Sequence, residues 1–144
     1  MKFNQGTKFY QFFTGLFITI TFVSCNTDVD FNDVINVNEP YLLYEYSYND
    51  NDKLTHSVLD TILVNSSLHN QFTKFLKDHN NEWQATPASY ICDFSVQQNN
   101  FRLLGWKNSE TIIVSFIDQK GIPKQLYRKV NPRELEFITQ LFIP

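Results

Sequence analysis

Few side chains in this sequence of 144 residues could carry catalysis, and Cys92 is the first candidate among them. A cysteine nucleophile needs a lowered thiol pKa and a histidine within reach. Alternation places Cys92 between Tyr90 and Phe94 on one face of an expected strand, where aromatic neighbours favour a buried thiol. Free cysteine is among the residue types that proteins most often bury. We therefore interpret Cys92 as a structural residue.

The histidines and carboxylates form no recognisable catalytic or metal-binding pattern. His69 and His79 are ten residues apart on an expected helix, and at ~100° per residue they point about 80° away from each other. Glu134 and Glu136 are two apart on a second expected helix and diverge. Residues 49–52 lack the spacing and the terminal glutamate of an EF-hand, which favours a plain turn. We therefore assign no catalytic residue, metal or cofactor, and expect solvated histidines.

Tyrosines are concentrated in one short segment that alternates like a strand. Residues 41–48 hold four of the seven tyrosines. Exposed, Tyr44, Tyr46 and Tyr48 could form a recognition stripe, because tyrosine combines a large contact area with a polar tip. Buried, the same side chains would be sheet core with hydroxyls at the rim. The pattern favours core or edge packing and leaves the recognition stripe as the alternative.

Charge is divided unevenly along the chain. The sequence carries a net charge of −3 and a pI near 5.5, which argues against nucleic-acid binding. Five basic residues nevertheless fall within positions 120–133. On an edge strand, Lys124 and Arg128 would present a basic rim that could bind an acidic partner or lipid headgroups. The alternative is that these charges protect the edge from aggregation.

Residues 1–24 have the layout of a secretory signal peptide. Lys2 and Lys8 precede an uncharged apolar stretch from Phe9 to Val23. A retained transmembrane anchor is the alternative. A spanning helix needs ~20 predominantly apolar residues, and this stretch has only 15, several of them polar. The length therefore favours a secretion signal.

The end of this segment, Phe22-Val23-Ser24-Cys25, resembles the lipobox of bacterial lipoproteins of the Bacteroidetes type. Val23 and Ser24 match the family pattern, whereas Phe22 stands where leucine is usual. The resemblance implies that Cys25 is acylated, becomes the new N-terminus after cleavage, and holds the protein in the cell envelope by its lipid. The residue after the cysteine is Asn26 and not the aspartate that resembles a mark for retention in the inner membrane. The resemblance therefore leaves the outer membrane open as the destination, on its periplasmic or surface side. An ordinary signal peptide with a chance cysteine is the alternative.

The chain beyond the signal peptide divides into a tether and a single domain. Residues 26–38 are polar, acidic and rich in asparagine. We expect them to be flexible, so that 25–40 comprise the lipidated Cys25 and a tether, and 41–144 form the domain. Short polar breaks separate the strands and allow only antiparallel neighbours. The expected strands are 41–48, 89–96, 101–107, 111–118 and 122–129, with helices from Ser66 or Ser67 to Asn80 and from Asn131 onward.

Residues 53–64 fit either a strand or one helical face, and β-branched residues favour the strand of a hairpin. The pattern as a whole predicts an α+β fold: an antiparallel meander sheet of four to six strands packed with two helices. In topology, though in no sequence motif, this arrangement resembles cystatin-like and related inhibitor folds.

The absence of a catalytic motif favours a non-catalytic module of the envelope that binds a protein or a glycan. An immunity or inhibitor protein is a specific case of such a module. Two alternatives remain open at this point: a structural accessory subunit of an envelope complex, and a hydrolase without a familiar motif.

Overall fold

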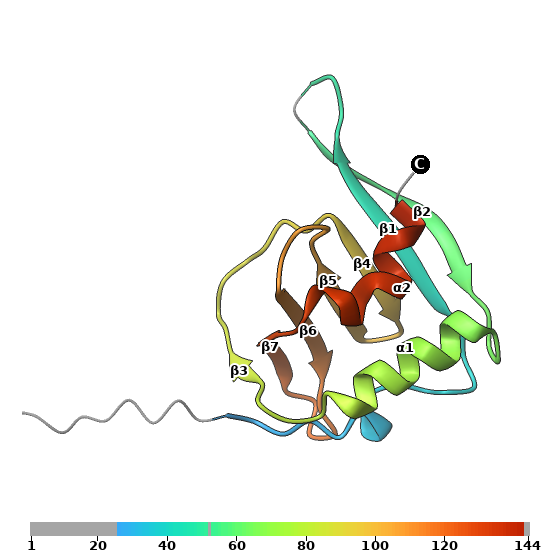
Figure 1. Ribbon diagram of the computed structural model, residues 1–144. Helices are drawn as coiled ribbons and strands as arrows, with labels where there is room; N and C mark the ends of the chain where they lie inside the picture. The colour runs from blue at the N-terminus through green and yellow to red at the C-terminus, as the bar shows by residue number, and fades with distance from the viewer. Residues whose placement is uncertain (1–25, 52, 143–144) are drawn as a thin grey trace, which may run out of the picture.

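The computed structural model describes residues 26–51 and 53–142, and the chain forms a twisted antiparallel sheet with helices packed on one face (Figure 1). Seven strands are found among these residues, in the order β2-β1-β4-β5-β6-β7-β3. The α+β class is therefore confirmed, and the sheet has more strands than the four to six expected. The strands are β1 Tyr41–Tyr48, β2 Leu54–Ile62, β3 Gln84–Ala85, β4 Phe94–Gln98, β5 Phe101–Gly105, β6 Thr111–Ile117 and β7 Pro123–Lys129.

Strands β4 to β7 form the predicted meander, in which each strand pairs antiparallel with the next. The first of them begins at Phe94, five residues later than expected, because the residues before it leave the sheet. Segment 53–64 contains the strand β2, which pairs with β1 from Tyr41–Ile62 to Tyr48–Leu54. The pairing shifts by one residue after Leu43, which leaves Leu59 as the extra residue of a β-bulge.

Helix α1 (Ser67–Asp78) carries the chain from β2, at one edge of the sheet, to β3 at the other. The side chain of Ser66 caps it by accepting a hydrogen bond from the backbone N–H of His69 at 3.1 Å. Its apolar stripe is buried against the sheet through Phe72, Phe75 and Leu76. The prediction of a helix that begins at Ser66 or Ser67 is therefore confirmed.

The C-terminal segment begins as predicted and then differs from a single helix. Asn131 and Glu134 form a capping box, with Pro132 at the first helical position. The chain continues as three short turns instead of one helix, and Leu135 and Ile138 are buried against the core. These turns are η2 Pro132–Leu135, α2 Glu136–Thr139 and η3 Gln140–Phe142.

In place of the expected flexible tether, the segment from Thr27 to Ile35 is part of the folded body. Thr27 and Trp83 exchange two backbone hydrogen bonds of 2.7 and 3.1 Å. Phe31, in the short 3-10 helix η1 (Phe31–Asp33), is 1% exposed and lies edge-on to the rings of Trp83 and Phe101. The composition is polar, but the few apolar residues are spaced so that they all reach the core.

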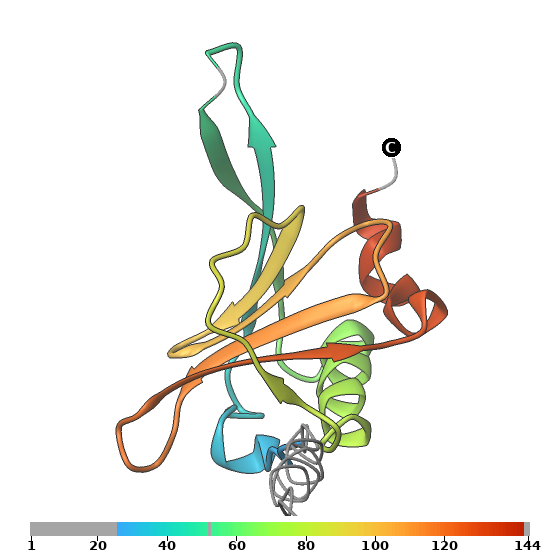
Figure 2. The ribbon, with the colours of Figure 1, turned by 90° about the vertical axis from the view of Figure 1, so that its left-hand side faces the viewer.

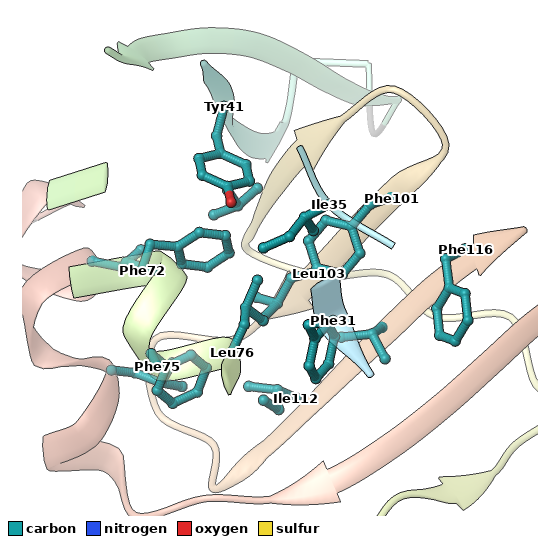
Figure 3. Packing of buried hydrophobic residues seen from close by; sticks show 14 of the residues in the cluster. Phe31, Ile35, Tyr41, Phe72, Phe75, Leu76, Phe101, Leu103, Ile112 and Phe116 are labelled. Atoms are coloured by element: carbon teal, nitrogen blue, oxygen red, sulfur yellow. The ribbon is translucent and has the colours of Figure 1, made fainter. Parts of the chain in front are cut away.

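The main hydrophobic core lies between the helices and one face of the sheet (Figure 3). Side chains of α1 meet those of the central strands there, and the first segment closes the same core through Phe31 and Ile35. Gly105 permits this packing, because a Cβ at that position would lie 2.2 Å from the ring of Phe94 on the paired strand.

The opposite face of the sheet is crossed by residues 86–93, which we call the strap (Figure 2). The backbone N–H of Thr86 donates to the carbonyl of Gln125 on β7, and the indole N–H of Trp106 donates to the carbonyl of Ile91 at 2.7 Å. A second, smaller cluster lies between the strap and the sheet, and its buried members are Cys92, Leu104 and Ile113. The strap thus gives the sheet a second layer.

Candidate functional site

The β1–β2 hairpin extends past the rest of the sheet and forms the most prominent projection of the molecule (Figure 2). Strand β1 pairs with β4 only from Leu42 to Glu45. Beyond that point, among the residues that the structure describes, β1 and β2 have only each other as strand neighbours. We call this part the arm: Tyr46–Tyr48, Leu54–Val58 and the turn that joins them.

The turn at the tip of the arm is organised by an asparagine side chain. The Oδ1 atom of Asn49 accepts hydrogen bonds of 3.0 Å from the backbone N–H groups of Asn51 and Lys53. The backbone N–H of Asn49 also donates to the carbonyl of Lys53 at 3.0 Å. These bonds explain the Asn-rich turn without a cation. In the described part of the chain, no group of three or more His, Cys, Asp or Glu side chains is placed to hold a metal ion.

The tyrosines of β1 are divided between the two environments that the sequence left open. Tyr41 is fully buried in the main core, and its hydroxyl bonds to Thr73. Tyr46 is half-buried against the strap cluster, with its hydroxyl 3.1 Å from the Oγ atom of Ser95. Tyr48 is 59% exposed near the tip. Both packing and exposure therefore occur along one strand.

Tyr44, Tyr46 and Tyr48 lie on the strap side of the sheet. Tyr44 and Tyr46 pack on either side of His56, with ring centroids 5.8 and 5.7 Å from the imidazole. Pairing also brings Leu54 and Val58 of β2 to this face, opposite Tyr48 and Tyr44. The result is a ladder of aromatic and aliphatic side chains that continues onto the arm.

Strand β2 is an edge strand, and eight of its nine residues are exposed. The backbone N–H of Tyr46 points away from β2, towards the carbonyl of Asp93. In an antiparallel ladder its partner His56 must then direct its own N–H and C=O away from β1, to the free edge. Leu54 and Val58, two residues to either side, follow the same alternation. The outer edge of the arm therefore presents backbone donors and acceptors beside exposed apolar side chains.

The basic residues do not join the tyrosines. Register places Lys124 and Arg128 opposite Phe116 and Ile112, on the helix side of the sheet, and β7 lies four strands away from β1. Lys124 forms an ion pair of 3.6 Å with Asp118. The predicted binding residues thus occupy opposite faces and opposite ends of the sheet, and they do not form one site.

Arg128 has a structural role. Its guanidinium donates to the backbone carbonyl and the side-chain oxygen of Asn81, and pairs with Glu82 at 3.4 Å. The side chain is only 14% exposed. These contacts hold the loop between α1 and β3 against β7, so Arg128 is not free to form a basic rim.

Cys92 is buried, in agreement with the sequence, but it lies in the strap and not in a strand with Phe94. It packs on the strap side, whereas Phe94 belongs to the main core. Burial raises the pKa of the Cys92 thiol to about 11. A neutral, shielded thiol is a poor nucleophile.

The expectation of solvated histidines is wrong for His69, which is 2% exposed. Its Nε2 atom is 3.1 Å from the carbonyl of Glu39. His79 is also largely shielded, between the carbonyl of Phe75 and the carboxylate of Glu134. Both histidines fasten α1 to neighbouring segments.

The predicted signal peptide and lipobox, including Cys25, lie outside the described residues. Within residues 26–51 and 53–142, no helix has the length and apolar character required to cross a membrane. Searches of protein-family models, curated proteins and solved structures found no match to this chain.

Proposed function

We propose that this protein is a non-catalytic binding module of the bacterial cell envelope, held there by lipid on Cys25, and that it binds another protein through the free edge of β2. The observation that carries the proposal is the edge itself: a strand of nine residues, exposed over eight of them, on a hairpin that projects from the body.

An exposed edge strand usually carries residues that prevent other chains from pairing with it. Proteins protect exposed edge strands with lysine, proline or an inward-pointing charge, because free backbone groups otherwise pair with other chains. Strand β2 contains neither lysine nor proline, and its one Asp or Glu is Asp60, beyond the bulge and away from the arm. Leu54, Val58 and Leu59 are all at least 40% exposed. The arm is therefore open to strand addition.

The chemistry of the edge favours a protein over a glycan. Backbone N–H and C=O groups at the regular spacing of a strand match those of another extended chain, and the alternating side chains beside them add specificity. A glycan would use the aromatic ring faces, but the rings of Tyr44 and Tyr46 are half-buried around His56. An accessory subunit of an envelope complex would use the same edge, and a fixed stoichiometry of the captured complex would identify that case.

The test is a cross-linking capture from envelope extracts with two variants of one residue. His56→Pro removes the outward N–H of β2 and leaves the bonds to β1 in place, whereas His56→Ala removes only the imidazole. We expect the natural chain and His56→Ala to capture the same partner and His56→Pro to lose it. Equal capture by a folded His56→Pro variant would contradict the proposal.

The anchor is tested separately. Cys25→Ser should move the protein from the membrane fraction to the soluble fraction, and mass spectrometry should find acyl chains on Cys25 of the natural protein. Firm membrane association of Cys25→Ser would show that the attachment is something else.

A further inference from the structure

The chain between the proposed anchor, Cys25, and the first fixed residue of the folded body is very short. Thr27 is fixed to Trp83 by two backbone hydrogen bonds, and the N–H of Val29 donates to the carbonyl of Asn80 at 2.7 Å. Only Asn26 separates Thr27 from Cys25. Two residues of extended chain span about 7 Å. A lipid on Cys25 would therefore hold the body directly at the membrane surface.

The end of the molecule where this link enters also carries the β6–β7 turn. Side chains of the first described segment and of the β6–β7 turn line one hollow of about 410 Å³; they include Asp28, Asp30, Asp33, Asp118 and Lys120. Both ribbon views place η1 and this turn at one end of the body and the tip of the arm at the other (Figures 1 and 2). Whatever holds the first end at a surface therefore directs the arm away from it.

The β6–β7 turn displays apolar side chains on a rigid loop. The Oδ1 atom of Asp118 accepts hydrogen bonds of 2.9 and 2.8 Å from the backbone N–H groups of Lys120 and Ile122. Gly121 adopts a φ of 76°, which this tight turn requires. Ile117 and Ile122 flank the turn at 46% and 48% exposure. The turn is held in shape while its isoleucines stay in contact with solvent.

Charge at this end is net negative and does not favour anionic lipid. The hollow contains two lysines and four aspartates: Lys120, Lys124, Asp28, Asp30, Asp33 and Asp118. Attraction of the lysines to an acidic surface is opposed by the neighbouring carboxylates. The favourable contact that remains is the burial of the Ile122 side chain among the lipid headgroups. The short chain between Cys25 and Thr27 strengthens this contact, because it keeps the β6–β7 turn close to the lipid surface and so gives Ile122 a high effective concentration there.

We propose that the end formed by residues 27–34 and the β6–β7 turn lies against the lipid surface, with Ile122 at the headgroups and the arm directed away from the membrane. This orientation rests on the lipid anchor of the proposed function. It presents the free edge of β2 to partners at a distance from the bilayer.

The test uses the lipidated full chain in phosphatidylcholine vesicles, with an environment-sensitive fluorophore on a cysteine introduced by Ile122→Cys or by Tyr48→Cys. Cys92 is replaced by alanine so that one site is labelled. We expect a blue-shifted emission and strong quenching by lipid-borne quenchers at position 122, and neither effect at position 48. The same labels on Cys25→Ser proteins should show no quenching.

The outcomes separate the two proposals. A label at position 122 that stays unquenched in a protein still bound to vesicles would overturn the orientation and leave the anchor intact. Quenching at position 48 equal to that at 122 would overturn it as well. Absence of lipid on Cys25 would instead refute the anchor of the proposed function.

Discussion

The buried body and the projecting arm of this protein share one strand but differ in what holds them. Tyr41 and Leu43, at the start of β1, are completely buried. Five residues further on, Tyr48 is 59% exposed on the arm. The sequence pattern is similar at both ends of the strand. Alternation of apolar side chains therefore indicates a strand, but it does not tell which part of the strand is covered.

The two regions also differ in how far they can be stable alone. A two-stranded hairpin is at best marginally stable in water, whereas a sheet packed by helices is not limited in this way. The base of the arm is fastened through Tyr46 to the strap cluster and through the ion pair of Glu45 with Lys107 at 3.0 Å. No such contact to the body is found for the outer part of the arm within the described part of the chain, which leaves its exposed edge available to a partner.

The largest expected effect is the truncation of Phe31, in the segment that the sequence suggested was a tether. Phe31→Ala removes a ring that is 1% exposed, and we expect a loss of ~3–5 kcal/mol in the free energy of unfolding. Tyr48→Ala on the arm should change it by less than ~0.5 kcal/mol. Urea denaturation of both variants gives the comparison. Similar values for the two would contradict the division into body and arm.

A second comparison uses two glycines. Gly105→Ala places a Cβ against the ring of Phe94 in the core, which should cost ~1–3 kcal/mol by overpacking. Gly121 has a positive φ and nothing within 4 Å of an added Cβ, so Gly121→Ala should cost about 1 kcal/mol from backbone conformation alone. The melting temperatures of the two variants, measured by thermal denaturation, show which substitution destabilises the fold more. A more damaging change at Gly121 would show that the core can make room at Gly105.

The reactivity of Cys92 tests whether the strap excludes solvent from its face of the sheet as the helices do on the other face. Burial raises the pKa of the thiol to about 11, so its neutral form stabilises the fold below the pKa of the unfolded chain. That contribution should be lost as the pH rises towards 11. At pH 8 a disulfide reagent should modify Cys92 slowly in the folded protein and rapidly in urea. Rapid modification of the folded chain would show that the strap opens readily.

The smallest effect concerns local opening. Amide hydrogens at the outer end of the arm, including those of Leu54 and His56, should exchange faster than those of the central strands β5 and β6. Hydrogen exchange followed by mass spectrometry measures the difference. Addition of the captured partner should slow exchange on β2 and leave the central strands unchanged.

Several elements were predictable because their causes are local. The start of α1 at its capping serine, the start of the C-terminal segment at Asn131 and the meander of four strands follow from neighbouring residues and short breaks. The packing of residues 27–35 in the core was not predicted, because the core residues of this segment are few and dispersed among polar ones. The strap was missed because Cys92 and Tyr90 alternate like strand residues although they leave the sheet.

The candidate site shows the same limit. The tyrosines and the basic residues were each visible in the sequence, but their separation to opposite faces follows from the register of β1 with β4 and of β6 with β7. The free edge of β2 could have been suspected from its lack of lysine and proline, since that strand has no guard residue. Its position at the edge of the sheet was not visible in the residues.

The amino-acid sequence by itself determined the types of most elements, where most of them begin, and the α+β class, since hydrophobic period, caps and turn residues act within a few positions of the backbone. Only the tertiary structure decided that residues 27–35 belong to the core, that β2 is an exposed edge strand, and that Arg128 is held in contacts with Asn81 and Glu82. These features depend on contacts between segments distant in the chain, and no local pattern encodes which surfaces such contacts cover.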